Sequence, residues 1–198
     1  MAAIGEATER ASSITQQLLA FGQRSMLVPS TFDATTLTRD LQDEAREVLP
    51  RTVALRLELA QSLPVVRTDR GRLREVIVQL CIRAAGALSA GGTLTISTGV
   101  GALGAGAPAV VIRVSDTGEP LPESDGRDFL EPFAGPLPTG TDSWSGLELA
   151  MAAGFMRQIG GEVTVESEEG IGTVVTLVIP AGVKEDDGAG PDRTSGGD

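Results

Sequence analysis

The stretch Val111–Gly118 (Val-Ile-Arg-Val-Ser-Asp-Thr-Gly) most constrains the fold of this chain. Its first residues are largely apolar and β-branched, which is typical of a buried strand. Asp116 follows at the end of that strand, and Gly118 gives the backbone the freedom to turn. A carboxylate held there can accept hydrogen bonds from a planar amine such as the exocyclic amine of adenine, and Gly118 would let the base lie close to the backbone. Taken alone, Asp-x-Gly after a strand also fits a plain turn.

The composition is that of an ordinary soluble globular protein, and it excludes several functional classes. Apolar residues make up 41% of the 198 residues and charged residues 22%, as in a typical folded domain. The net charge is −11 and we find no cluster of Lys and Arg, so we expect no nucleic-acid partner. The sequence has no apolar run long enough to cross a membrane and no secretory signal. We therefore expect a cytoplasmic protein with no membrane partner.

The chain contains no His and a single Cys. Without imidazole it cannot carry phosphohistidine, use His as a general base or ligate a metal through His. One Cys excludes an internal disulfide and a cysteine-based zinc site. Cys81 lies among apolar neighbours on a predicted helix, so we expect a buried structural thiol.

Apolar periodicity predicts three helices in the first half of the chain. Helices are predicted over residues 34–48, with Asp33 as N-cap, and over residues 70–89, with Asp69 as N-cap. Residues 3–24 repeat apolar positions at alternating spacings of three and four, which is the seam of a coiled coil or helical bundle. That seam consists of Ile4, Ala7, Ala11, Ile14, Leu18 and Phe21. We expect this first helix to dimerise or dock, although packing on its own domain is the plainer alternative.

Alternation of apolar and polar residues predicts five strands. They cover residues 52–59, 93–100, 109–115, 162–168 and 173–179. Residues 119–145 are rich in Pro, Gly, Asp and Ser, which predicts a functional lid or a mobile loop, and a helix is predicted over residues 146–159. We expect a dimerisation or docking helix at 1–28, a globular domain at 29–181, and a disordered acidic tail at 182–198.

In the order of its elements and motifs, nearly the whole of residues 1–181 resembles the catalytic, ATP-binding domain of bacterial sensor histidine kinases. That domain belongs to the superfamily shared with gyrase, heat-shock chaperone and mismatch-repair ATPases. The resemblance is carried by Thr15–Arg24, similar to the second helix of the dimerisation hairpin of hybrid-type kinases; Leu63–Asp69, before the helix that bears the family's metal-binding Asn; Gly91–Ile96, the next strand; Val114–Gly118, the first glycine box; Glu131–Phe133, the phenylalanine box; and Gly161–Thr173, the final hairpin.

The resemblance implies an α/β fold, a two-layer sandwich in which a mixed sheet is backed by helices. It also implies that nucleotide is held between the helices and the lid. The candidate cofactor-binding residues that it assigns are Asp116, Gly118, Gly146, Leu147, Gly172, Thr173 and Arg83. It assigns no catalytic and no metal-ligating residue.

The chain departs from the family where Mg²⁺ and phosphates would bind. Arg83 stands where the family has its metal-binding Asn, and a guanidinium offers no lone pair and repels the ion. Pro120 replaces the second glycine of the first box, and Trp144 and Glu148 replace glycines of the second. Those glycines let backbone N–H groups approach the phosphates. Glu148 would instead place a negative charge near that anion site.

These departures lead to one main hypothesis and two alternatives. The main hypothesis is a kinase-like module of two-component phosphorelay signalling that binds Mg-ATP weakly or not at all. It would form a homodimer or dock through its N-terminal helix, and bind a response regulator or a His-bearing kinase hairpin. The first alternative is an active ATP-dependent histidine kinase domain that phosphorylates a His on another chain, with Arg83 neutralising phosphate charge in place of Mg²⁺. The second alternative is an anti-sigma-type regulatory switch.

Overall fold

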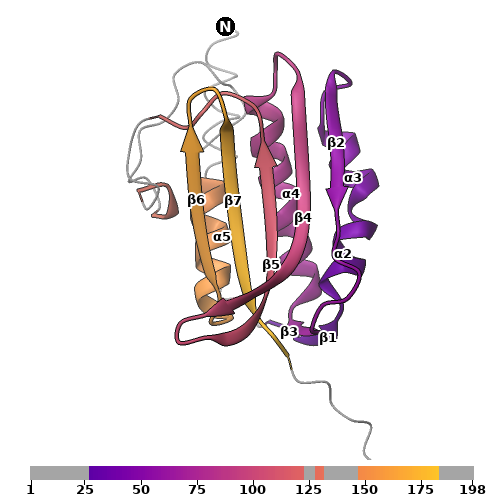
Figure 1. The fold of residues 1–198 in the computed structure, drawn as a ribbon, viewed down its shortest axis with the longest axis vertical. Helices are drawn as coiled ribbons and strands as arrows, with labels where there is room; N and C mark the ends of the chain where they lie inside the picture. The colour runs from indigo at the N-terminus through magenta and orange to yellow at the C-terminus, as the bar shows by residue number, and fades with distance from the viewer. Residues whose placement is uncertain (1–26, 123–127, 132–146, 183–198) are drawn as a thin grey trace, which may run out of the picture.

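The protein is described here by a computed structural model that covers residues 27–122, 128–131 and 147–182. Five strands form one mixed sheet in the order β2-β4-β5-β7-β6, with helices on one of its faces (Figure 1). The strands are β2 (Val53–Glu58), β4 (Gly92–Leu103), β5 (Ala107–Asp116), β6 (Glu162–Glu168) and β7 (Gly172–Pro180). β2 runs parallel to β4, and all other neighbours are antiparallel. The predicted two-layer α/β sandwich is therefore confirmed.

Four helices pack behind the sheet in the view of Figure 1. They are α2 (Ala34–Asp40), α3 (Gln42–Val48), α4 (Arg70–Ala87) and α5 (Leu147–Gln158), and a short 3-10 helix covers Asp128–Leu130. The sequence predicted α4 and α5 to within two residues at each end. The helix expected over residues 3–24, most of the segment 119–145 and the tail after residue 182 lie outside the described residues.

The single helix expected over residues 34–48 is wrong, because the chain forms two helices that meet at Leu41. Leu41 has ψ of −5°, well away from the usual helical value near −42°. The break was hidden in the sequence because Leu37, Leu41 and Ala45 keep helical spacing and are all buried. Two backbone hydrogen bonds, Leu41 N to Leu37 O and Ala45 N to Leu41 O, still bridge the break.

A second, two-stranded sheet escaped the sequence analysis. It pairs β1 (Ser30–Phe32) with β3 (Val66–Thr68) in antiparallel register. Each strand has three residues, which is too short for an alternating pattern to be recognised. This small sheet lies at the end of the domain where α4 begins (Figure 1).

The core lies between the large sheet and its helices. On the inner face of the sheet, Ile96, Ile112 and Leu177 are fully buried, and they occupy matching positions on three adjacent strands. α4 contributes Leu73, Ile77 and Leu80, and α5 contributes Leu149 and Met156, all fully buried. Burial of this apolar surface is the main force that holds α4 and α5 against the strands.

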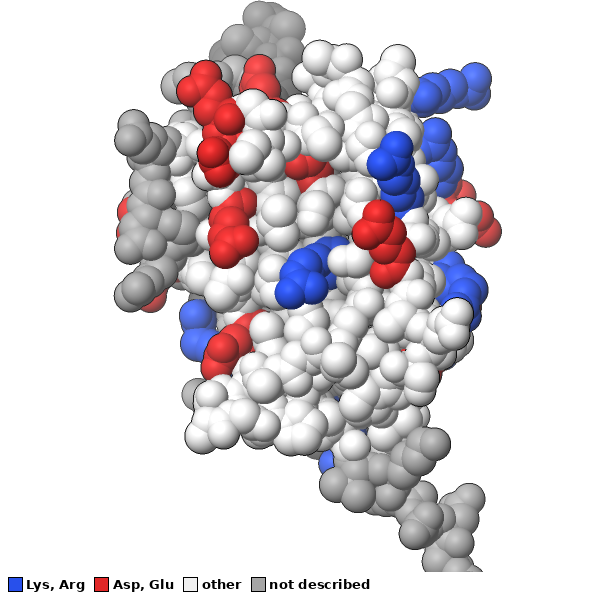
Figure 2. Space-filling view, in the orientation of Figure 1, with Lys and Arg blue, Asp and Glu red and all other residues white. Residues whose placement is uncertain are grey.

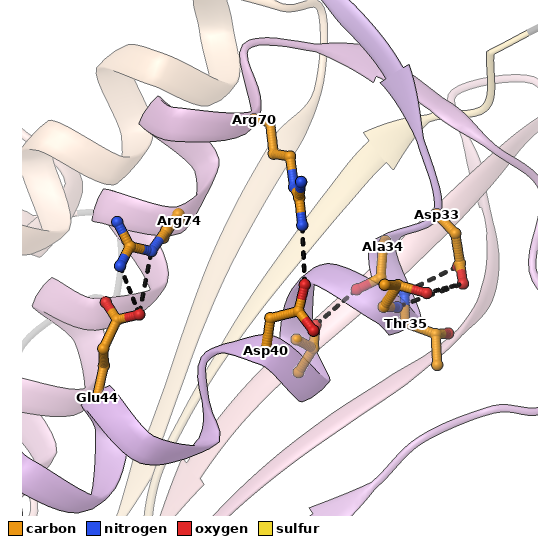
Figure 3. Close-up of polar contacts among 9 residues, drawn as sticks. Asp33, Ala34, Thr35, Asp40, Glu44, Arg70 and Arg74 are labelled. Atoms are coloured by element: carbon orange, nitrogen blue, oxygen red, sulfur yellow. Dashed lines mark hydrogen bonds and ion pairs between the residues drawn. The ribbon is translucent and has the colours of Figure 1, made fainter.

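Exposed ion pairs join α4 to α2 and α3 (Figure 3). Arg70 Nη2 lies 2.8 Å from Asp40 Oδ2, and Arg74 Nη2 lies 2.5 Å from Glu44 Oε1. Their side chains are a third to a half exposed, so each pair contributes at most about 1 kcal/mol. They fix the orientation of the short helices, whereas the core supplies the stability.

The outer face of the sheet carries scattered charges of both signs, and its lower part in Figure 2 is largely uncharged. Alternation along the strands turns the exposed Arg113 to this face and its neighbours Ile112 and Val114 to the core. Within the part of the chain that the structure describes, no helix is long and apolar enough to span a membrane.

Asp69 joins the start of α4 to the segment that precedes β1. Its Oδ1 accepts a hydrogen bond from the Arg72 N–H and its Oδ2 accepts one from the Val28 N–H, each at 3.0 Å. These backbone N–H groups, Val28 first, hold the pKa of Asp69 below its ordinary value. Because the folded pKa is depressed, this contribution to stability is present above the unfolded pKa near 3.8 and is lost as the pH falls through the folded pKa.

We predict that Asp69→Ala lowers the free energy of unfolding by about 1 kcal/mol at pH 7, the usual cost of losing an N-cap. Urea unfolding at pH 7 and at pH 3.5 measures it, and the variant should lose less stability than the wild type on acidification. Asp43→Ala, at an exposed position in the first turn of α3, is the matched control. Equal acid sensitivity of Asp69→Ala and the wild type would contradict this role of Asp69.

Candidate functional site

The candidate site is centred on Asp116, the last residue of β5. Strand register places Asp116 beside Leu94 of β4 and Thr173 of β7, and Thr173 beside Ser167 of β6. These residues form one row on the inner face of the sheet. Asp116 is only 3% exposed, and its Oδ1 accepts a hydrogen bond of 3.0 Å from the Gly118 N–H. A carboxylate thus lies buried at the end of the sheet, facing the helices.

Arg83 of α4 supplies the partner of this carboxylate. Its Nη2 donates a hydrogen bond to Asp116 Oδ2, and the two side chains are 3% and 0% exposed. The sequence separation is 33 residues, so only the packing of α4 on β5 brings these two predicted site residues together. Nε of Arg83 is buried and has no hydrogen-bond partner among the described residues. This ion pair is therefore fully desolvated, unlike the exposed pairs that join α4 to α2 and α3.

Gly118 lies against the end of α4. A Cβ at Gly118 would overlap the carbonyl group of Ala87, and the neighbouring Glu119 N–H donates to the same Ala87 oxygen at 3.1 Å. Thr117 is tied to the start of β4, because its N–H donates to Thr93 O and its Oγ1 accepts from the Thr93 N–H. The space left by the missing side chain at position 118 is therefore filled by helix backbone.

Gly172 and Thr173 belong to the β6–β7 hairpin beside Asp116. Gly172 has φ of 119°, and a Cβ there would clash with the Asp116 carbonyl oxygen, so only glycine fits this crossing. Thr173 is fully buried, and its Oγ1 lies 2.9 Å from Ser167 Oγ. Ser167 Oγ also accepts a 2.9 Å hydrogen bond from the Leu121 N–H. The hairpin thereby holds the segment that leaves Asp116.

The remaining candidates lie at or before the start of α5. Leu147 is the first residue of α5, and Gly146 and Trp144 lie outside the described residues. Glu148 is buried, at 4% exposure, in the first turn of the helix. A negative charge is favourable at that end of a helix because the N-terminal N–H groups carry partial positive charge.

The described residues do not fit a Mg²⁺ ion. Among them no group of three or more His, Cys, Asp and Glu side chains could hold a metal. The position that the family resemblance assigns to the metal ligand carries the Arg83 guanidinium, which has donors only. The Asp116 carboxylate already accepts two hydrogen bonds, one on each oxygen.

Two contributors to the site were missed in the sequence. Ser167 was not singled out, although hairpin pairing and the period of two would have placed it on the same face as Thr173. Ala87 contributes through its carbonyl group, and a backbone contact leaves no signal in a side-chain pattern. Both hold the segment Thr117–Leu121 in place above Asp116.

Comparison with known families and proteins finds clear similarity. Residues 68–183 match the family described as histidine kinase-, DNA gyrase B- and HSP90-like ATPase. Sensor kinase CckA of Brucella abortus is 31% identical over 92% of this chain and 20% of its own length. Sensor histidine kinase ZraS of Escherichia coli is 27% identical over 92% of this chain and 37% of its own length. The chain therefore spans a fifth to about two-fifths of these relatives.

Solved structures show the same fold. Full-length ShkA in complex with AMPPNP matches with a TM-score of 0.67 and 24% identity, over 90% of this chain and 37% of that one. Histidine kinase ThkA in complex with the response regulator TrrA matches with a TM-score of 0.67 and 20% identity, over 90% of this chain and 49% of that one.

We predict strong coupling between Arg83 and Asp116 in a double-mutant cycle. Arg83→Met or Asp116→Asn alone should lower the free energy of unfolding by about 3–5 kcal/mol, because each leaves a buried charge unpaired. The combined variant should lose clearly less than the sum of the two, since it buries no unpaired charge. Urea unfolding measures all four proteins. Strict additivity would show that the two side chains do not interact.

Cys81 lies two positions before Arg83 and is 1% exposed, which confirms the expected buried thiol. Burial raises the pKa of Cys81 to about 12, despite the opposing charge of Arg83. The folded protein thus favours the neutral thiol, and stability should fall as the pH rises from the unfolded pKa of 9.0 toward 12.

We predict that iodoacetamide at pH 8 labels Cys81 in urea but not in the folded protein, because the thiolate is the reactive form. Mass spectrometry after timed quenching measures the labelling. Comparable rates in the folded and unfolded states would contradict the buried, neutral thiol.

Proposed function

Because this chain belongs to the histidine kinase-, DNA gyrase B- and HSP90-like ATPase family, we propose that it is a histidine-kinase-type module that no longer binds Mg-ATP in the ordinary way. It acts in two-component signalling by binding phosphorelay partners. The observation that carries this proposal is the buried ion pair between Arg83 and Asp116.

The ion pair supports the loss of adenine binding. Asp116 is the carboxylate to which the family resemblance assigns the adenine amine, and its Oδ2 already accepts a hydrogen bond from Arg83. A base can reach that oxygen only if the guanidinium leaves a buried position. Separating a buried pair costs about 3–5 kcal/mol, which lowers affinity by roughly two to four orders of magnitude.

The charge of Arg83 supports the loss of metal binding. A guanidinium at the expected metal position repels Mg²⁺ and has no lone pair to offer it. Its contact with Asp116 also directs the guanidinium to the carboxylate. The alternative of an active kinase, in which Arg83 neutralises phosphate charge, therefore gains no support from this geometry.

The relatives indicate the kind of partner. CckA and ZraS are sensor kinases, and ThkA has been solved in complex with a response regulator. This chain contains no His, so any phosphoacceptor His in the relay belongs to another chain. A response regulator or a His-bearing kinase hairpin is the proposed partner, and a homodimer through residues 1–28 is the proposed assembly.

We predict that calorimetric titration of Mg-ATP into the wild-type protein gives no saturable binding at micromolar concentrations. Arg83→Asn combined with Glu148→Gly should bind Mg-ATP measurably, because it removes the cation beside Asp116 and the acid at the start of α5. Arg113→Asn, on the outer face of the sheet, is the matched control and should stay silent. Tight, magnesium-dependent binding to the wild type would refute the proposal.

A further inference from the structure

The Arg83–Asp116 pair differs in kind from the other ion pairs that the structure describes. The pairs Arg70–Asp40, Arg72–Glu75 and Arg74–Glu44 have side chains that are a third to a half exposed, whereas Arg83 and Asp116 are almost completely buried. Exchange of a buried pair for apolar residues is often neutral or stabilising. Stability alone therefore does not explain why two charges lie here.

We infer that Arg83 is an internal ligand: its guanidinium fills a cation site, built around Asp116, whose ligand class is a planar guanidinium or amidinium. This inference rests on the proposed function and deepens it, because it names what occupies the site in place of a nucleotide. The site is separable from the side chain that fills it, so a free cation of the same shape binds when that side chain is removed.

The surroundings of Asp116 define the shape of this site. The Gly118 N–H holds Oδ1 at 3.0 Å, so the carboxylate is oriented by the backbone and presents Oδ2 to Arg83. The backbone of Gly172 crosses directly over Asp116 and restricts movement of the carboxylate further. A guanidinium matches a fixed carboxylate because its donors lie in one rigid plane, whereas an ammonium is a point charge.

The unpartnered Nε of Arg83 is a second indication of a site. This atom is buried and has no hydrogen-bond partner within the described residues. A pair selected only to hold the fold would be expected to satisfy every buried donor, because an unsatisfied one is costly. The guanidinium therefore occupies the site through its contact with the carboxylate, with one donor left over.

Arg83→Ala converts this arrangement into an open site. The atoms that the substitution removes correspond to N-ethylguanidinium, and the carboxylate that they leave behind is buried and oriented. A buried carboxylate without its partner strongly favours a cation. N-ethylguanidinium can fill the space and restore the hydrogen bond, whereas ethylammonium has the charge without the planar set of donors.

The test titrates N-ethylguanidinium chloride into Arg83→Ala at constant ionic strength and follows the Gly118 amide by NMR, since that amide bonds to Asp116. We expect saturable binding at least about tenfold tighter than to the wild type, to Arg113→Ala or to Arg83→Ala/Asp116→Asn, as for a hydrogen bond to a charged group. Ethylammonium should bind at least about tenfold more weakly, and N-ethylguanidinium should raise the midpoint of thermal unfolding of Arg83→Ala alone.

Two results would overturn the inference: equal binding of N-ethylguanidinium and ethylammonium, or binding that persists without the Asp116 carboxylate. If Arg83→Ala does not fold, the wild type decides through the exchange of its guanidinium protons with water. Those of Arg83 should exchange far more slowly than those of Arg113, and equal rates would refute a resident guanidinium. Binding of Mg-ATP to the wild type refutes the proposed function instead, so the two failures are distinguishable.

Discussion

The contact between the Arg83 guanidinium and the Asp116 carboxylate is the interaction on which the rest of the site depends. It joins the last part of α4 to the end of β5 in a region closed to solvent. Because each charge is desolvated, each requires the other, and neither can be exchanged alone without a large penalty. The contacts of Gly118 with Ala87 and of Gly172 with Asp116 pack the backbone closely around this pair.

Much of the fold was predictable because periodicity reports directly on burial. Alternation identified all five strands of the large sheet, and helical spacing identified α4 and α5. The break at Leu41 was not predictable, because the buried positions on either side keep helical spacing. β1 and β3 are too short for a pattern, and they form because the segment around Val28 is tied to Asp69.

The site was predictable in its members but not in its arrangement. The sequence singled out Arg83 and Asp116 separately, one as a lost metal ligand and the other as a retained base-binding carboxylate. Their contact depends on how α4 packs on β5, which no local pattern encodes. Gly118 and Gly172 are both required by close backbone approach, so their presence in the sequence says more about the fold than about a ligand. Arg83 is the residue that discriminates between the two.

A crystal structure grown with a saturating, non-hydrolysable ATP analogue and Mg²⁺ tests the central claim most directly. Our account predicts electron density for the Arg83 guanidinium on the Asp116 carboxylate, with no nucleotide base beside it. A structure in which Arg83 has swung away and the adenine amine is bonded to Asp116, with Mg²⁺ on the phosphates, would contradict it.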